Sequence, residues 1–69
     1  MNENQIYIVT VLNSDYEFAC ERIFCVGMNN VHKVVKRLKK SYPNCSIHCN
    51  KAVTSFDGGL VNGDYVKSF

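Results

Sequence analysis

The run IYIVTVL, from Ile6 to Leu12, most strongly constrains how this 69-residue chain can fold. Six of its seven residues are apolar, and most of them are β-branched. Continuous apolar runs of this length are typical of strands that are buried on both faces. We therefore expect this strand at the centre of a sheet, with a strand on each side of it and cover over each face.

The residues that follow predict a hairpin. Residues 13–15 (NSD) have turn chemistry, and residues 16–26 (YEFACERIFCV) return to strand composition. Glu21 and Arg22 interrupt this second run, and a β-bulge at that point would accommodate them. The bulge would bring four side chains to one face of the strand, namely Phe18, Cys20, Ile23 and Cys25.

One amphipathic helix and a third strand are expected next. The apolar positions of the helix recur at helical spacing and are Val31, Val34, Val35, Leu38 and Tyr42. Asn29 or Asn30 is expected to cap its first turn, and Pro43 with Asn44 ends it. Residues 45–53 (CSIHCNKAV) then alternate as a strand, with Cys45, Ile47 and Cys49 on one side and Ser46, His48 and Asn50 on the other.

This element order predicts an α+β fold in a single small domain, residues 1–69. A right-handed ββαβ crossover places the first strand in the middle, giving a mainly antiparallel sheet of order 2-1-3. Residues 1–5 form a polar tail, and the Gly-rich residues 54–69 form a loop or small hairpin turning at Asn62 and Gly63. One helix covers only one sheet face. The other needs a second copy, a partner or the C-terminal side chains Phe56, Leu60, Tyr65 and Phe69.

Composition and cysteine content limit the chemistry. The 46% hydrophobic and 20% charged residues indicate a globular protein, and no apolar run approaches a membrane span. A polar N-terminus without targeting character favours the cytoplasm, which is the host cytoplasm if a phage encodes the chain. The four cysteines should then stay reduced and pack as small hydrophobes. We expect no cofactor and no catalytic site.

Zinc is the alternative role for the thiols. Its candidate ligands are Cys20, Cys25, Cys45, His48 and Cys49. If residues 45–49 form a strand, their ends lie roughly 13 Å apart, which is too far for one ion to bind both. Packing therefore remains the preferred interpretation.

Charge is concentrated in the helix. Its segment holds five of the eight basic residues and no acidic residue, whereas the rest of the chain holds three basic and six acidic residues. Lys33 with Arg37, and Lys36 with Lys40, form like-charge pairs at i,i+4 spacing, which disfavour an isolated helix. The basic surface is either a solvated back face or a contact surface. A contact surface would bind an acidic protein or, alternatively, nucleic acid. No base-reading motif is visible.

A resemblance to a known family bears on this choice. The hairpin IYIVTVLNSDYEFACERIF, the helix VHKVVKRLKKSYP and the strand CSIHCNK resemble in order and spacing the very small phage inhibitors of bacterial RNA polymerase. The resemblance implies a non-enzymatic protein-binding module, such as a phage modulator of a host machine or defence system. It also implies that a cation late in the third strand contributes to binding, and Lys51 occupies that place. The helix of the family is acidic, whereas this one is basic.

The expected contact residues follow from the charge and from the resemblance. They are Lys33, Lys36, Arg37, Lys40, Lys51 and His48. The expected partner is a host or phage protein with an acidic surface. Nucleic acid is the alternative, a homodimer through the open sheet face or edge is a further option, and no membrane partner is expected.

Overall fold

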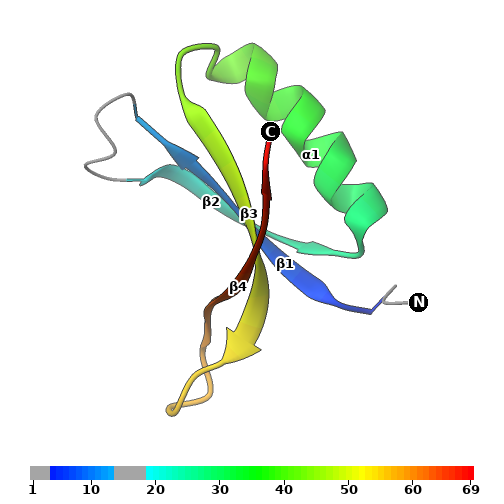
Figure 1. The fold of residues 1–69 in the computed structure, drawn as a ribbon, viewed down its shortest axis with the longest axis vertical. Helices are drawn as coiled ribbons and strands as arrows, with labels where there is room; N and C mark the ends of the chain where they lie inside the picture. Colours follow the sequence, from blue (N-terminus) through cyan, green and yellow to red (C-terminus); the bar gives the residue numbers. More distant parts are fainter. Residues whose placement is uncertain (1–3, 14–18) are drawn as a thin grey trace.

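The computed structural model describes residues 4–13 and 19–69 (Figure 1). Within them, four antiparallel strands form one sheet of order β2-β1-β3-β4, and one helix packs on it. The elements are β1 (Ile6–Leu12), β2 (Ala19–Val26), α1 (Met28–Ser41), β3 (Ser46–Thr54) and β4 (Leu60–Ser68). The predicted α+β class is confirmed, with a fourth strand that the sequence analysis does not include.

The central position of β1 follows from its composition and is confirmed. β1 pairs with β2 on one side and with β3 on the other. Residues 7–11 are buried without exception, which requires cover on both faces of the strand. The predicted arrangement of the first three strands is therefore correct, and β4 adds to the outer edge of β3.

The helix covers one face of the sheet with the predicted stripe. Val31, Val35 and Leu38 are buried, and they pack in one core cluster with Val9 of β1 and Cys49 of β3. Figure 1 shows α1 beside the strands and roughly parallel to β1. No helix in the described part of the chain is long and apolar enough to cross a membrane.

The start of the helix differs from the prediction. α1 begins at Met28, and its N-cap is Gly27, without a side-chain capping bond. Gly27 has a φ of 83°, a conformation that favours glycine and turns the chain sharply out of β2. The Asn30 side chain donates a hydrogen bond back to the Val26 carbonyl at 2.6 Å and does not accept one from the first turn. The predicted Asn cap is therefore wrong.

An irregularity does occur in β2, but one residue earlier than predicted. Val11 pairs with Glu21, whereas Leu12 pairs with Ala19, so Cys20 is the extra residue. Extra residues of this kind are what β-bulges accommodate. The predicted turn at residues 13–15 and the placement of Phe18 involve residues 14–18, which lie outside the described residues.

The C-terminal turn lies five residues before the predicted one, because Ser55 and Asp57 supply its bonds. The Ser55 amide donates to the Gly59 carbonyl at 2.6 Å. The Asp57 carboxylate accepts from the Ser55 hydroxyl and from the Gly59 amide. The predicted turn residues, Asn62 and Gly63, instead lie within β4.

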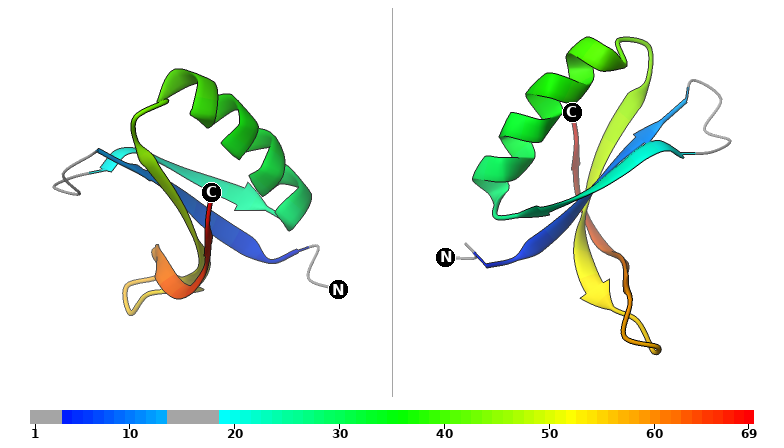
Figure 2. Two further views of the ribbon diagram at one scale, coloured as in Figure 1. Left: turned by 45° about the horizontal axis from the view of Figure 1, so that its top comes forward. Right: turned by 180° about the vertical axis from the view of Figure 1, so that it is seen from behind.

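The second sheet face is covered in part by the curl of the β3–β4 hairpin. Figure 2 shows the helix on one side of the sheet and the tip of this hairpin on the other. Ile8 is fully buried although it lies outside the helix-side cluster. Arg22 Nη2 donates to the Leu60 carbonyl at 3.5 Å, which connects β2 to the start of β4. The C-terminal segment thus contributes the expected cover, but as a strand.

The aromatic residues of this segment have different roles. Phe69 packs against the helix-side core, and Tyr65 and Phe56 are exposed. The C-terminal side chains are one of three alternatives for covering the second face, and Phe69 does not take that role because it lies on the helix side. Tyr65 and Phe69 are four residues apart, so alternation alone would place them on the same face. Lys67 pairs with Cys49 and Tyr65 with Asn50, which leaves Val66 as an extra residue, and this register shift turns the two rings to opposite faces.

Leu38 tests the helix-side core. It is 2% exposed, so Leu38→Ala should lower the free energy of unfolding by about 2 to 5 kcal/mol, the usual loss for a buried Leu. Urea unfolding followed by circular dichroism measures the change. The exposed neighbour Lys39→Ala is the control and should change stability by about 0.5 kcal/mol or less. Equal effects of the two variants would contradict this placement of the helix.

Gly63 tests the pairing of β3 with β4. A Cβ there would lie 2.6 Å from Val53 Cγ1 and 3.0 Å from the Lys51 carbonyl oxygen. Gly63→Ala should therefore destabilise the protein by about 1 to 3 kcal/mol, as overpacking does. At Gly59 the same change meets only ordinary contacts of 3.5 Å, so Gly59→Ala should be close to neutral. A neutral Gly63→Ala in the same unfolding assay would show that β4 does not pack there.

Candidate functional site

Cationic side chains occupy the outer side of α1, a surface that we call the basic face. Its five members are all exposed and are Lys33, Lys36, Arg37, Lys39 and Lys40. The helix itself carries no acidic residue. The described carboxylates lie on other elements, Glu21 on β2, Asp57 in the turn and Asp64 on β4. The basic face is therefore a surface of one sign on one element.

The last residues of the chain lie beside this helix. The Phe69 ring contacts His32 edge-on, with ring centroids 5.7 Å apart. Lys67 Nζ lies 4.9 Å from the Phe69 ring centroid, within cation–π range. Phe69 thus holds a further cation near the N-terminal half of α1. The sequence pattern of residues 54–69 does not predict a fourth strand, so it does not place these residues beside the helix.

Lys51 and His48 do not join the basic face. Lys51 is half-buried on β3 opposite Tyr7, so it is on the helix side of the sheet but on a different element. His48 is opposite Thr10, and alternation puts it on the face away from the helix. The predicted contact residues therefore form one helix cluster and two separate positions on β3.

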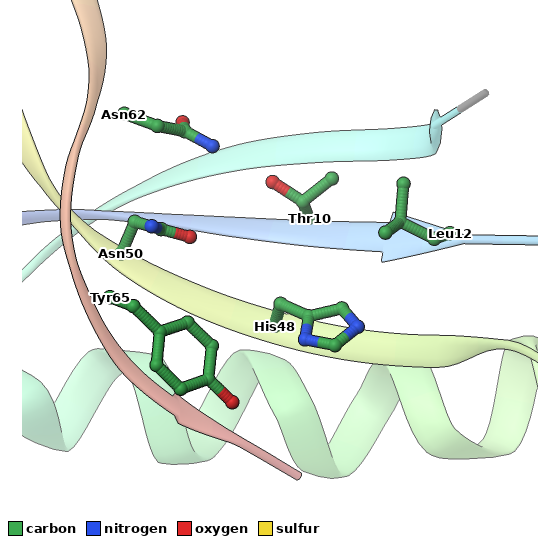
Figure 3. A pocket seen from close by; sticks show the side chains of 6 residues that line it. All are labelled: Thr10, Leu12, His48, Asn50, Asn62 and Tyr65. Carbon is green, nitrogen blue, oxygen red and sulfur yellow. The ribbon is translucent and has the colours of Figure 1, made fainter. Parts of the chain in front are cut away.

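A pocket lies on the sheet face away from the helix (Figure 3). It is open and has a volume of about 310 Å³. Three strands contribute to it, with Thr10 and Leu12 from β1, His48 and Asn50 from β3, and Asn62 and Tyr65 from β4. Only His48 is among the residues expected to bind a partner. The alternation of residues 45–53 predicts that His48 and Asn50 lie on the same face of their strand. Nothing in the sequence predicts that Asn62 and Tyr65 join them.

Hydrogen bonds hold the pocket side chains in place. The Tyr65 hydroxyl bonds the Ser68 hydroxyl, which lies 2.9 Å from His48 Nδ1. The His48 and Tyr65 rings have centroids 6.3 Å apart and are inclined by 51°. Asn50 Nδ2 donates to the Gly63 carbonyl at 3.1 Å. These bonds join β3 to β4 and fix two rings and an amide at the pocket wall.

The thiols lie in two places. Cys25 and Cys49 are in the core, where burial raises the pKa of both. Partial burial also raises the pKa of Cys45, the residue before β3, and a hydrogen bond with Cys20 adds to that shift. Among the described residues, no three side chains of His, Cys, Asp or Glu converge as metal ligands. Cys25 and Cys49 thus pack in the core as predicted, whereas Cys20 is exposed and Cys45 is half-buried.

Thiol reactivity tests this arrangement. A raised pKa leaves less thiolate at a given pH, and Cys25 and Cys49 are also inaccessible. At pH 8 the exposed Cys20 should be alkylated first, and the core thiols roughly 100-fold or more slowly, because they react only after opening. Timed alkylation with peptide mass spectrometry measures both rates. If Cys25 or Cys49 of the native protein were alkylated as fast as Cys20, that residue would lie outside the core. The same assay in urea, where all thiols are exposed, is the control.

Comparison of the chain with protein-family models, with characterised proteins and with solved structures found no match. The candidate surfaces therefore rest on the geometry of this chain alone.

Proposed function

We propose that the protein is a non-enzymatic binding module that uses the basic face of α1 to contact an acidic protein surface. The observation that carries this proposal is the exclusive positive charge of the exposed helix side, opposite the buried Val31, Val35 and Leu38. Patches of one sign accelerate the encounter with an oppositely charged partner and orient it.

The arrangement of charge on the helix has a cost without a partner. Lys33 with Arg37 and Lys36 with Lys40 repel at i,i+4 spacing, each by about 0.2 to 0.5 kcal/mol. Lys39 and Lys40 interact favourably with the C-terminal end of the helix dipole, which accounts for two of the five cations. The other three gain nothing comparable in the isolated chain. An anionic partner would compensate for them.

The overall charge favours a protein over nucleic acid. The net charge is only +2 and the isoelectric point about 8.4, below the value above 9 that is typical of nucleic-acid-binding domains. The basic face consists of four lysines and one arginine, and the exposed ring of α1 beside it, His32, is already packed edge-on against Phe69. Binding of nucleic acid through α1 is the alternative that the experiment below distinguishes.

The broader role that we propose is that of a phage-type modulator of a host machine or defence system. Its support is the resemblance of residues 7–51 in element order to the small phage inhibitors of RNA polymerase. The opposite charge of the helix indicates a different, acidic contact surface on the target. Lys51 is the one position that the resemblance adds to the proposed contacts.

Charge removal tests the proposal. Lys36→Ser with Lys40→Ser should leave the fold intact, since exposed substitutions usually change stability by about 0.5 kcal/mol or less each. Capture of proteins from nuclease-treated bacterial lysate, quantified by mass spectrometry, should show a partner that is retained several-fold less by this variant. Retention by the parent should also fall as salt is raised.

Lys36→Arg with Lys40→Arg is the matched control, because it changes the same two positions and keeps their charge. It should retain the partner. Equal retention by both variants and the parent would show that the basic face is only solvated. Loss of the partner by the arginine variant as well would show that the partner does not recognise charge at these positions, and capture that disappears with nuclease would favour nucleic acid.

A further inference from the structure

The pocket on the helix-free sheet face has the chemistry of a small-ligand site, independent of the basic face. Its volume of about 310 Å³ is at the lower end of the range for small-molecule pockets. It combines an apolar wall at Leu12 with hydroxyl, amide and ring groups, and it contains no lysine, arginine or carboxylate. The moiety that fits it is therefore small and uncharged.

Thr10 is the strongest indication that the pocket takes a ligand. The residue is 9% exposed, and among the described residues its hydroxyl has no hydrogen-bond partner. Such a group loses its water without replacement, which is costly for the folded state. In Figure 3 the hydroxyl of Thr10 points toward the side of the pocket that carries Asn50 and Asn62. A ligand that reaches this side can supply the missing bond.

Asn50 and Asn62 complete a polar edge. The Asn50 amide nitrogen is already bonded to the Gly63 carbonyl, which leaves its oxygen as the acceptor. Asn62 is exposed and offers both a donor and an acceptor. Together with the Thr10 hydroxyl, this edge can accept from an amino group and donate to a ring nitrogen beside it.

Tyr65 and His48 supply aromatic surface next to that edge. Tyr65 is 59% exposed, yet its hydroxyl is held by Ser68, which also bonds His48. Both rings are thus fixed before any ligand arrives. Aromatic rings beside amide groups are the arrangement by which proteins hold unpaired bases, stacking on the ring and bonding the base edge.

We propose that this pocket binds a nucleobase that carries an exocyclic amine, adenine or cytosine. The amine would donate to Asn50 Oδ1, and the ring nitrogen beside it would accept from the Thr10 hydroxyl. The base would lie against Tyr65. Uracil presents carbonyl oxygens where the amine is needed, so it should bind more weakly. The base can belong to a free nucleoside or to a single strand.

Titration of the ¹⁵N-labelled full chain with adenosine, cytidine, uridine and glucose tests the proposal by NMR. Adenosine or cytidine should produce saturable shifts at Thr10, Asn50 and Tyr65, with uridine roughly fivefold or more weaker, the usual discrimination of a good base contact. Short oligoadenylate distinguishes the source. Tighter, salt-dependent binding than adenosine assigns a single strand, and equal binding assigns a free nucleoside.

Thr10→Val separates binding from folding. It removes the hydroxyl but keeps the shape, so the protein should remain as stable as the parent or become more stable, while adenosine binding weakens roughly fivefold or more. Thr54→Val makes the same change at an exposed β3 position outside the pocket and should bind as the parent does. Tyr65→Leu should also weaken binding. Unchanged binding by Thr10→Val, stronger binding of glucose, or no saturable shift with either amino base would overturn the proposal.

Discussion

Burial of β1 on both faces is the constraint on which the rest of the structure depends. The helix covers one face of β1, where Val9 packs in the same core cluster as Val31 and Leu38. On the other side Ile8 is buried without a second helix, and the curled β3–β4 hairpin lies there. A chain of this length buries a smaller fraction of its surface than larger domains do. The β3–β4 hairpin forms one edge of the sheet and also covers part of its second face, so no additional element is needed there.

The same constraint decides where the pocket forms. Ile8 is fully buried, but the hairpin does not close over Thr10 and Leu12 further along β1. The residues of β3 and β4 that adjoin this opening are polar or aromatic, unlike the aliphatic residues of the helix side. Incomplete cover leaves apolar surface on this face at Phe24, which pairs with Ile8 and is 51% exposed. At the pocket it also exposes hydroxyl, amide and ring groups held by bonds between strands.

Features that depend on local periodicity could be predicted from the sequence. The alternation of β3, the apolar run of β1 and the 3.6-residue stripe of α1 each leave a repeated signal. The position of the hairpin turn could not be predicted, because Asp-Gly and Asn-Gly pairs compete, and the turn forms where the side chains of Ser55 and Asp57 supply its bonds. The basic face could be predicted because all of its residues belong to one helix. The pocket could not be predicted, because Thr10 and Tyr65 are brought together only by the pairing of β1 with β3 and of β3 with β4.

The two candidate surfaces differ in what they cost the fold. Each like-charge pair on α1 costs a few tenths of a kcal/mol and can be removed without touching the core. The buried hydroxyl of Thr10 costs about 1 to 3 kcal/mol, a large part of the 5 to 15 kcal/mol that stabilises a typical domain. Valine would fill the same space without that loss, and the neighbouring positions of β1 show that it suits a buried strand. The presence of threonine at the pocket wall is therefore a stronger functional indication than the number of cations on the helix.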